Sequence, residues 1–301
     1  MGSLHHFLTM TFVQQTGPQR LERCPEPHQL TDAADNVVQY DQVLTTKLAI
    51  AYAVGLEIVH RARSPITAGS AVDLACGPGH YTLCLAQHLR YDAIEGIDLS
   101  APMVETARAN ADRQGMQNRV RFRTGDVTAL SDVPSGSVDL ASFTDAAHHL
   151  PDLDRVERVL REMERISKPD GLVMVMDLVR LRTAELTERY VQTLGHDYVA
   201  RGLPAFFDDF RNSMYAAWTA DELHGAIPRD SQRWWCHIVP RGLPTIQIIL
   251  GLPVGRQKLF VRSGFPWPKD QNPVPPSMRW EWRLLRWSLA LGSRRWVPPT
   301  R

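Results

Sequence analysis

Three aspartates stand where their carboxylates could bind the polar groups of a single ligand. Asp73 precedes Gly77 by four residues, Asp98 follows Gly77 by twenty-one, and Asp126 comes after a further apolar run. Asp98 is placed to accept hydrogen bonds from two ribose hydroxyls, and Asp126 could accept one from an adenine amino group. Asp73 could hold an ammonium group, directly or through water, but would repel a pyrophosphate. Together the three acids predict a ligand with an ammonium group, a ribose and an adenine, and no phosphate.

The loop that would bring this ligand close to the backbone contains two glycines. It lies in AVDLACGPGHYTLCLA, residues 71–86, where Gly77 and Gly79 allow a sharp turn and a close approach. The helix expected behind them presents free N–H groups to a ligand. The dinucleotide pattern G-x-G-x-x-G would need a third glycine, but Thr82 stands there. The alternative, a tight turn without a ligand, is disfavoured by the acidic residues around it.

Short apolar runs alternate with helical patterns along the chain. Strands are expected over residues 71–75, 93–98, 119–126, 137–143 and 171–179, with two more around 233–239 and 245–250. Consecutive parallel strands need a crossover connection, and the helical stretches between them supply it. The pattern therefore predicts an α/β fold with a doubly wound, mostly parallel sheet of seven strands.

In such a sheet a ligand binds outside the carboxyl ends of the strands, near the point where the strand order reverses. The residues to examine are therefore those that follow each strand: 76–81, Asp98 and Leu99, 125–127, and 144–149. The last of these segments contains Asp145, His148 and His149.

Four motifs in register suggest the identity of the ligand. VDLACGPGHYT, GIDLS with Met103, TGDV and FTDAAHHLPD resemble, in order and spacing, the motifs of class I S-adenosylmethionine-dependent methyltransferases. The resemblance covers roughly residues 40–178. Within that superfamily, AAHHLPD followed by RISKPDGLVMVMDL is similar to the ubiquinone and menaquinone biosynthesis type of small-molecule methyltransferases.

This resemblance implies a Rossmann-like methyltransferase fold, with S-adenosylmethionine as the cofactor and a small, largely apolar or aromatic methyl acceptor. It places the cofactor against the three aspartates and against Tyr40, Ala75, Gly77, Gly79, Leu99, Met103, Val127 and Thr144. Tyr40 and Asp41 would close over the cofactor, as N-terminal aromatics do in similar enzymes. Asp126 has an alternative role, since it could simply cap the short segment after it.

Asp145, His148 and His149 are the candidate catalytic residues, because they follow the fourth strand beside the expected methyl group. An imidazole that titrates near neutrality could accept a proton from a phenol, enol or thiol nucleophile. The alternative is that these residues only shape the pocket, since methyl transfer from a sulfonium needs chiefly in-line positioning. The sequence leaves both roles open, and it shows no metal-binding pattern.

The chain divides into five expected parts. These are a loose N-terminal arm over residues 1–30, a cofactor-binding core over 31–180, a helical cap over 181–218, the end of the core sheet over 219–262, and a Pro-rich linker with a Trp/Arg-rich tail over 263–301. The cap is rich in aromatic residues, and this favours an apolar or aromatic substrate.

The tail carries an apolar stripe at helical spacing: Trp280, Leu284, Trp287 and Leu291. Six arginines lie between residues 278 and 301, against the single acid Glu281. Such a helix could rest on an anionic membrane surface. We expect instead that it packs on its own domain or on a partner subunit.

Composition narrows the remaining choices. The 301 residues are 44% hydrophobic and carry a net charge of +1, so nothing in the overall field attracts nucleic acid. The four cysteines form no C-x-x-C pair, so neither a zinc knuckle nor a disulfide framework is indicated, and a reducing cytoplasm is the simplest location. Two rival functions remain: a non-catalytic sensor or partner subunit that binds the same cofactor, and an NAD-dependent oxidoreductase, which Asp73 and Thr82 disfavour.

Overall fold

The structure of the protein, a computed structural model, describes residues 10–26, 38–40, 42, 46–62, 69–89, 91–242, 245–253 and 274–300. Asp41, the first nine residues of the expected N-terminal arm and most of the expected linker before residue 274 lie outside the described residues.

One sheet organises the molecule, with the strand order β3-β2-β1-β4-β5-β7-β6-β8. The strands are β1 (Ser70–Leu74), β2 (Ala93–Asp98), β3 (Val120–Thr124), β4 (Val138–Thr144), β5 (Ser167–Leu178), β6 (Trp234–Val239), β7 (Ile246–Leu252) and β8 (Ser293–Val297). The first five run parallel, whereas β7 is antiparallel to β5 and to β6. The strand order reverses between β1 and β4, so the ligand position expected for such sheets lies at their carboxyl ends.

The prediction of seven strands was wrong, because the described residues form a sheet with an eighth strand. β8 pairs antiparallel with β6, from Val297 opposite Trp235 to Ser293 opposite Val239. The sequence hides it, since Ser-Arg-Arg-Trp-Val shows neither an apolar run nor a regular alternation. Part of the segment expected as a separate tail is thus the outermost strand of the sheet.

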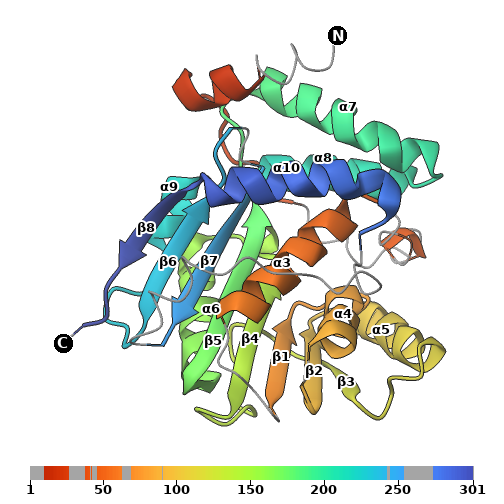
Figure 1. The fold of residues 1–301 in the computed structure, drawn as a ribbon, viewed down its shortest axis with the longest axis vertical. Coiled ribbons are helices and arrows are strands. Elements are labelled where there is room, and N and C mark those ends of the chain that lie inside the picture. The colour runs from red at the N-terminus through yellow and green to blue at the C-terminus, as the bar shows by residue number, and fades with distance from the viewer. Residues whose placement is uncertain are drawn as a thin grey trace.

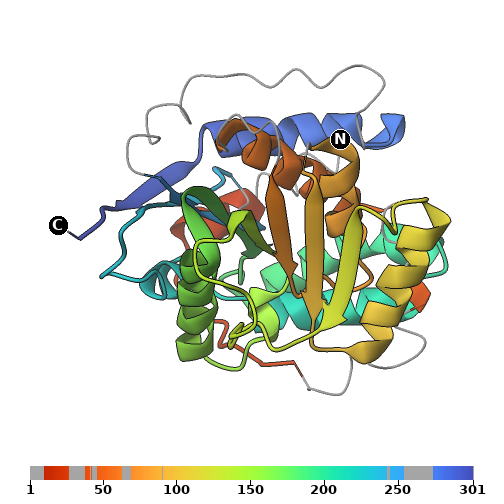
Figure 2. The same cartoon turned by 90° about the horizontal axis from the view of Figure 1, so that it is seen from below.

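Helices cover both faces of the sheet (Figures 1 and 2). One face holds α3 (Leu48–Ala62), α4 (His80–His88), α5 (Ala101–Arg113) and α10 (Arg279–Ala290), and the other holds α6 (Leu153–Ile166) and α9 (Ala220–Gly225). Alternate residues of a strand point to opposite faces, so Met174 and Met176 join the first core while Val173 and Val175 join the second. The predicted doubly wound arrangement is confirmed in this respect.

Two helices lie beyond the ends of β4 and β5, α7 (Ala184–Ala200) and α8 (Pro204–Ala216) (Figure 1). Tyr198 of α7 meets Phe206 of α8 edge to face, with ring centroids 5.0 Å apart. A short 3-10 turn, η2 (Ala147–His149), follows β4 and contacts α8. The aromatic helices expected over residues 181–218 therefore lie next to the loop that carries the candidate histidines.

The described part of the N-terminal segment, residues 10–26, is bound to the body of the protein. It starts with a helical stretch over residues 10–16. Gln14 accepts a hydrogen bond from the main-chain N–H of Arg182 at 2.9 Å. The main-chain N–H groups of Arg20 and Leu21 both donate to the carbonyl oxygen of Arg182. These contacts hold the segment against the start of the α7–α8 region.

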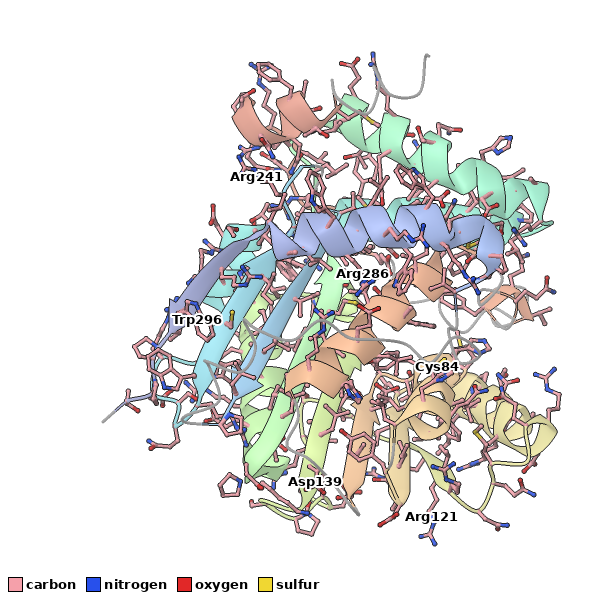
Figure 3. The ribbon with its side chains drawn as sticks, in the orientation of Figure 1. Cys84, Arg121, Asp139, Arg241, Arg286 and Trp296 are labelled. Carbon is pink, nitrogen blue, oxygen red and sulfur yellow. The ribbon has the colours of Figure 1, made fainter. Side chains whose placement is uncertain are left out.

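The helix α10 packs on α3 with one face only. Trp282 and Leu289 are buried, and Arg286 reaches α3, where its Nε lies 2.8 Å from the Glu57 carboxylate (Figure 3). The stripe predicted from the sequence lies on the opposite face and is exposed: Trp280, Leu284, Trp287 and Leu291. No helix among the described residues is long and apolar enough to cross a membrane.

Candidate functional site

The two loop glycines after β1 have different surroundings. Both have positive φ, +52° at Gly77 and +81° at Gly79, which favours glycine. A Cβ added to Gly79 would lie 2.7 Å from the Phe122 ring and 3.0 Å from Ala107, whereas one added to Gly77 meets nothing within 4 Å. Gly79 therefore permits close packing of α4 on its neighbours, and Gly77 borders open space. The non-glycine Ala75 also has a positive φ, +50°.

Asp98 lies at the end of β2, directly against the glycine loop. Its Oδ2 accepts the main-chain N–H of Gly77 at 2.7 Å, and its Oδ1 accepts that of Ser100 at 2.9 Å. Ser100 in turn caps α5 by accepting the N–H of Met103. The structure thus brings together three predicted cofactor residues, Gly77, Asp98 and Met103. Their neighbour Leu99 is 72% exposed.

Asp73 lies inside β1 and is fully buried. Thr82 Oγ donates to its Oδ2 at 2.6 Å, and Ser142 Oγ donates to its Oδ1 at 2.8 Å. Burial raises the pKa of Asp73 to about 6, against the opposing effect of these hydrogen bonds. Thr82, which stands where the dinucleotide pattern has its third glycine, is therefore a partner of the buried carboxylate.

Asp126 is exposed after β3, and it caps the turn that follows. Its Oδ1 accepts both the main-chain N–H and the hydroxyl of Thr128, at 2.8 and 2.7 Å. These hydrogen bonds lower the pKa of Asp126. The structure therefore shows the capping role that was one of the two alternatives for Asp126. The contact of Asp126 with an adenine amino group stays a prediction. Val127 and Thr144 are buried beside the strand ends.

Tyr40 joins the glycine loop to α8. Its carbonyl oxygen accepts a hydrogen bond at 3.0 Å from His80, the first residue of α4. Its hydroxyl donates to the buried carboxylate of Asp209 in α8, and its ring meets Phe206 edge to face at 4.8 Å. This position, between the loop and the two outer helices, is compatible with the predicted closure over the cofactor.

The loop after β4 begins with Asp145, a non-glycine residue with φ of +50°. Burial and the nearby Asp177 carboxylate raise the pKa of Asp145 to about 7. His148 Nδ1 donates to Asp177 Oδ1 at 2.6 Å, and both side chains are buried. Burial alone would lower the pKa of His148, but the Asp177 carboxylate outweighs it and raises the value to about 9.

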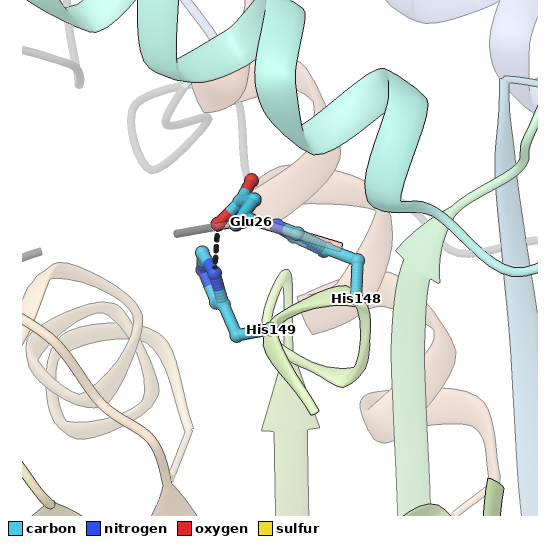
Figure 4. Close-up of side chains that lie close together, drawn as sticks. All are labelled: Glu26, His148 and His149. Atoms are coloured by element: carbon cyan, nitrogen blue, oxygen red, sulfur yellow. Dashed lines mark hydrogen bonds and ion pairs between the residues drawn. The ribbon is translucent and has the colours of Figure 1, made fainter. Parts of the chain in front are cut away.

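His149 is held by Glu26, a residue of the N-terminal segment. Its Nδ1 donates to Glu26 Oε2 at 2.5 Å (Figure 4). Ser213 Oγ donates to the second oxygen, Oε1, at 2.6 Å. Burial would raise the pKa of Glu26, but the hydrogen bond and charge of His149 hold it at about 2. The rings of His148 and His149 lie 4.2 Å apart.

Arg23 fixes the N-terminal segment to this loop. Its guanidinium donates to four main-chain carbonyl oxygens, those of His148, Leu150, Pro151 and Ala216. No sequence pattern indicates Arg23 or Glu26, because both lie in a segment without periodicity and more than 120 residues before their partners. Asp177 was missed because it lies inside an apolar strand, and Asp209 and Ser213 because their helix gives no sign of partners more than 160 residues earlier in the chain.

A family model described as a methyltransferase domain matches residues 71–171, about a third of the chain. The matched region runs from β1 into β5 and contains the glycine loop, Asp98 and the two histidines.

Curated relatives match the same part of the chain. A demethylmenaquinone methyltransferase of Leptospira interrogans is 28% identical over 111 residues, covering 37% of this chain and 43% of the relative. A protein of the same name from Lactiplantibacillus plantarum is 29% identical over 136 residues, covering 45% of this chain and 54% of the relative. The chain thus spans about half the length of the curated relatives it matches.

Among solved structures, a protein of Methanococcus maripaludis to which S-adenosyl-L-methionine-dependent methyltransferase activity is assigned is similar over 77% of this chain and 97% of its own, with a TM-score of 0.55 and 19% identity. A protein of Pyrococcus horikoshii OT3 is similar over 70% of this chain and 93% of its own, with a TM-score of 0.50 and 18% identity. At these identities the likeness concerns the fold.

Proposed function

We propose that this chain, which contains a class I S-adenosylmethionine-dependent methyltransferase domain, transfers the cofactor's methyl group to a small, largely apolar or aromatic acceptor. The observation that carries the proposal is the contact of Asp98 with the N–H of Gly77 at 2.7 Å. It places a carboxylate suited to ribose hydroxyls beside an open glycine loop, in a site where the buried Asp73 disfavours phosphate.

The acceptor side is proposed to lie between the β4 loop and the α7–α8 pair, which would act as a cap. Tyr198 contacts both Phe206 and Phe210 edge to face, at 5.0 and 5.4 Å, so this region offers aromatic surface next to η2. Apolar pockets with a few placed polar groups are typical small-molecule sites. Two curated relatives named demethylmenaquinone methyltransferases support an apolar, ring-containing acceptor.

Asp145, His148 and His149 are proposed as the polar residues beside the transferred methyl group. Each is fixed, either by an unusual backbone conformation or by a carboxylate on Nδ1. Rigid positioning suits a reaction whose electrophile arrives already activated, because in-line geometry then limits the rate.

Calorimetry and turnover test the proposal in two steps. The protein should bind S-adenosylhomocysteine and should not bind NADH, because Asp73 and the missing third glycine disfavour a pyrophosphate. It should then consume S-adenosylmethionine in the presence of a panel of quinols and phenols, with methylated products detected by mass spectrometry. Cofactor binding without turnover on any acceptor of the panel would favour the non-catalytic sensor. NADH binding in place of S-adenosylhomocysteine would favour the oxidoreductase.

We further propose that the exposed face of α10 rests on an anionic bilayer surface. Trp280 and Trp287 are 66% and 65% exposed on the face opposite the one that packs on α3, and Arg283 and Arg294 are exposed near them. Interfacial tryptophans with flanking arginines suit the headgroup region of a membrane that contains acidic lipids.

Vesicle sedimentation tests this contact. The protein should sediment with phosphatidylserine/phosphatidylcholine vesicles, less with phosphatidylcholine alone, and much less after substitution of Trp280 and Trp287 by serine. Phe12→Ser is a matched control, since Phe12 is equally exposed, at 67%, but lies in the N-terminal segment. Equal sedimentation of the double variant and the unsubstituted protein would contradict the proposal.

A further inference from the structure

We propose that Glu26, His148 and His149 bind one divalent transition-metal ion. Each residue offers one ligand atom, an imidazole nitrogen or a carboxylate oxygen, and these atoms all lie within 4.8 Å of one another (Figure 4). Two histidines and one carboxylate form a ligand set typical of open metal sites, in which further positions remain for water or substrate. The binding itself does not depend on the proposed methyl transfer.

The distances require only a local adjustment. Ligand atoms about 2.0 to 2.2 Å from a tetrahedral ion lie roughly 3.4 Å from one another. The His149 nitrogen and the Glu26 oxygen, now 2.5 Å apart, would separate to admit the ion. Rotation of the side chains supplies movements of this size, because the His149 side chain is 30% exposed and can turn without displacing the core.

The neighbours of the three residues are arranged as outer partners of metal ligands. Asp177 accepts from Nδ1 of His148, which fixes the ring and leaves Nε2 as the ligand nitrogen. Metal-binding histidines commonly donate their second N–H to a carboxylate in this manner. Ser213 occupies Oε1 of Glu26 in the same way and leaves Oε2 beside His149.

The surroundings also favour a cation. Asp145 Oδ2, Asp177 Oδ2 and Asp209 Oδ1 are buried and have no hydrogen-bond partner among the described residues. Asp177 lies in direct contact with His148, Asp145 lies close enough to His148 to interact with its charge, and Asp209 lies close enough to both histidines. Several buried carboxylates around one point are costly unless positive charge balances them, and a divalent ion provides it.

The backbone around the cluster is held in place without an ion. Arg23 ties the N-terminal segment to the carbonyl oxygens of residues 148, 150 and 151, so Glu26 stays next to the two histidines. A site whose ligands are held in position loses less conformational entropy on binding.

The ligand types decide the class of ion. Two imidazoles and one carboxylate suit zinc, iron(II), cobalt(II) or manganese(II), whereas magnesium and calcium prefer oxygen ligands alone. If the chain transfers methyl groups as proposed, an ion at the β4 loop would bind the acceptor oxygen and lower its pKa. That use rests on the proposed function, and it would replace a free histidine base.

Calorimetric titration with zinc chloride tests the site in the full chain after treatment with a chelator. We expect one equivalent to bind, and we expect Glu26→Gln and His148→Ala each to weaken that binding at least about tenfold. His196→Ala is a matched control, because His196 is an exposed histidine of α7. A variant without His5 and His6 is a second control, since that pair near the N-terminus could bind metal by itself.

The absorption spectrum of bound cobalt(II) gives a second readout of metal ligation, which reports the ligand atoms directly and not the stability of the variants. A d–d spectrum of nitrogen and oxygen ligation should appear in the unsubstituted protein and disappear in Glu26→Gln, which keeps the size of the side chain. Unchanged zinc affinity in both variants, or no binding by the folded unsubstituted protein, would overturn the proposal. Zinc binding without S-adenosylhomocysteine binding would support the metal site and contradict the proposed function. S-adenosylhomocysteine binding without zinc binding would contradict the metal site and leave the proposed function standing.

Discussion

At the scale of single residues, Asp98 is the residue that we expect to bind the ribose of the cofactor. We expect Asp98→Ala to weaken binding of S-adenosylhomocysteine by about 2 to 4 kcal/mol, since two charge-assisted hydrogen bonds contribute roughly 1.5 to 3 kcal/mol each and do not add fully. Calorimetry on both proteins measures the loss. Asp92→Ala is the control, because Asp92 is an exposed acid just before the start of β2. Unchanged affinity in Asp98→Ala would remove Asp98 from the site.

Asp73 is expected to reduce the stability of the cofactor-free protein at neutral pH. Its pKa is raised from 3.8 to about 6 by burial, so the folded state binds more protons than the unfolded state between these values. Protonated Asp73 therefore stabilises the folded state at low pH, and this contribution is lost as the pH rises through about 6. At 1.36 kcal/mol per pKa unit, the loss amounts to about 3 kcal/mol.

The variant Asp73→Asn should lack this dependence. In denaturant titrations, the free energy of unfolding of Asp73→Asn minus that of the unsubstituted protein should increase between about pH 4 and pH 7. At the same time we expect it to bind the cofactor less tightly, because the carboxylate that would balance the ammonium group is gone. A stability difference that stays constant with pH would contradict the assignment.

At the scale of elements, the turn from β1 into α4 allows a comparison of its two glycines. Gly79→Ala should destabilise the fold by roughly 2 to 4 kcal/mol, because its Cβ would lie 2.7 Å from the Phe122 ring and its φ is positive. Gly77→Ala meets open space and should cost only the strain, about 1 to 2 kcal/mol. Gly77→Ala should chiefly weaken cofactor binding. Thermal unfolding together with calorimetry separates the two effects, and equal unfolding temperatures would contradict this difference.

The same turn shows what the sequence could and could not predict. The periods of strands and helices are local signals, and so are the glycines and the acids at the strand ends. The sequence therefore predicted β1 to β7 and the region where Gly77 meets Asp98. The family match over residues 71–171 confirms the methyltransferase resemblance. Glu26 reaches His149 across 123 residues, and no local pattern encodes such a contact. β8 was missed because an edge strand needs little apolar character.

At the scale of the whole molecule, α10 and β8 are expected to belong to the folded body. Removal of the chain after residue 275 would expose the surface that Trp282 and Leu289 cover and would take Arg286 away from the buried Glu57. Breaking a buried ion pair from one side typically costs about 3 to 5 kcal/mol. Denaturant titration should show a loss of at least that size, although all the predicted cofactor residues lie before residue 275 and remain in the truncated chain. Unaltered stability of the truncated protein would show that the segment is a dispensable appendage.

The eighth strand has one more consequence, for self-association. The two outermost strands of the sheet, β3 and β8, both carry arginines: Arg121 and Arg123 on one side, Arg294 and Arg295 on the other. A strand from another chain that paired with either edge would bring its own side chains against the exposed guanidinium groups of Arg121 and Arg294 and strip them of water. Charged edge strands of this kind discourage the stacking of sheets into aggregates. The arginine-rich end of the chain therefore protects β6, a strand with two tryptophans, from acting as a template for fibrils.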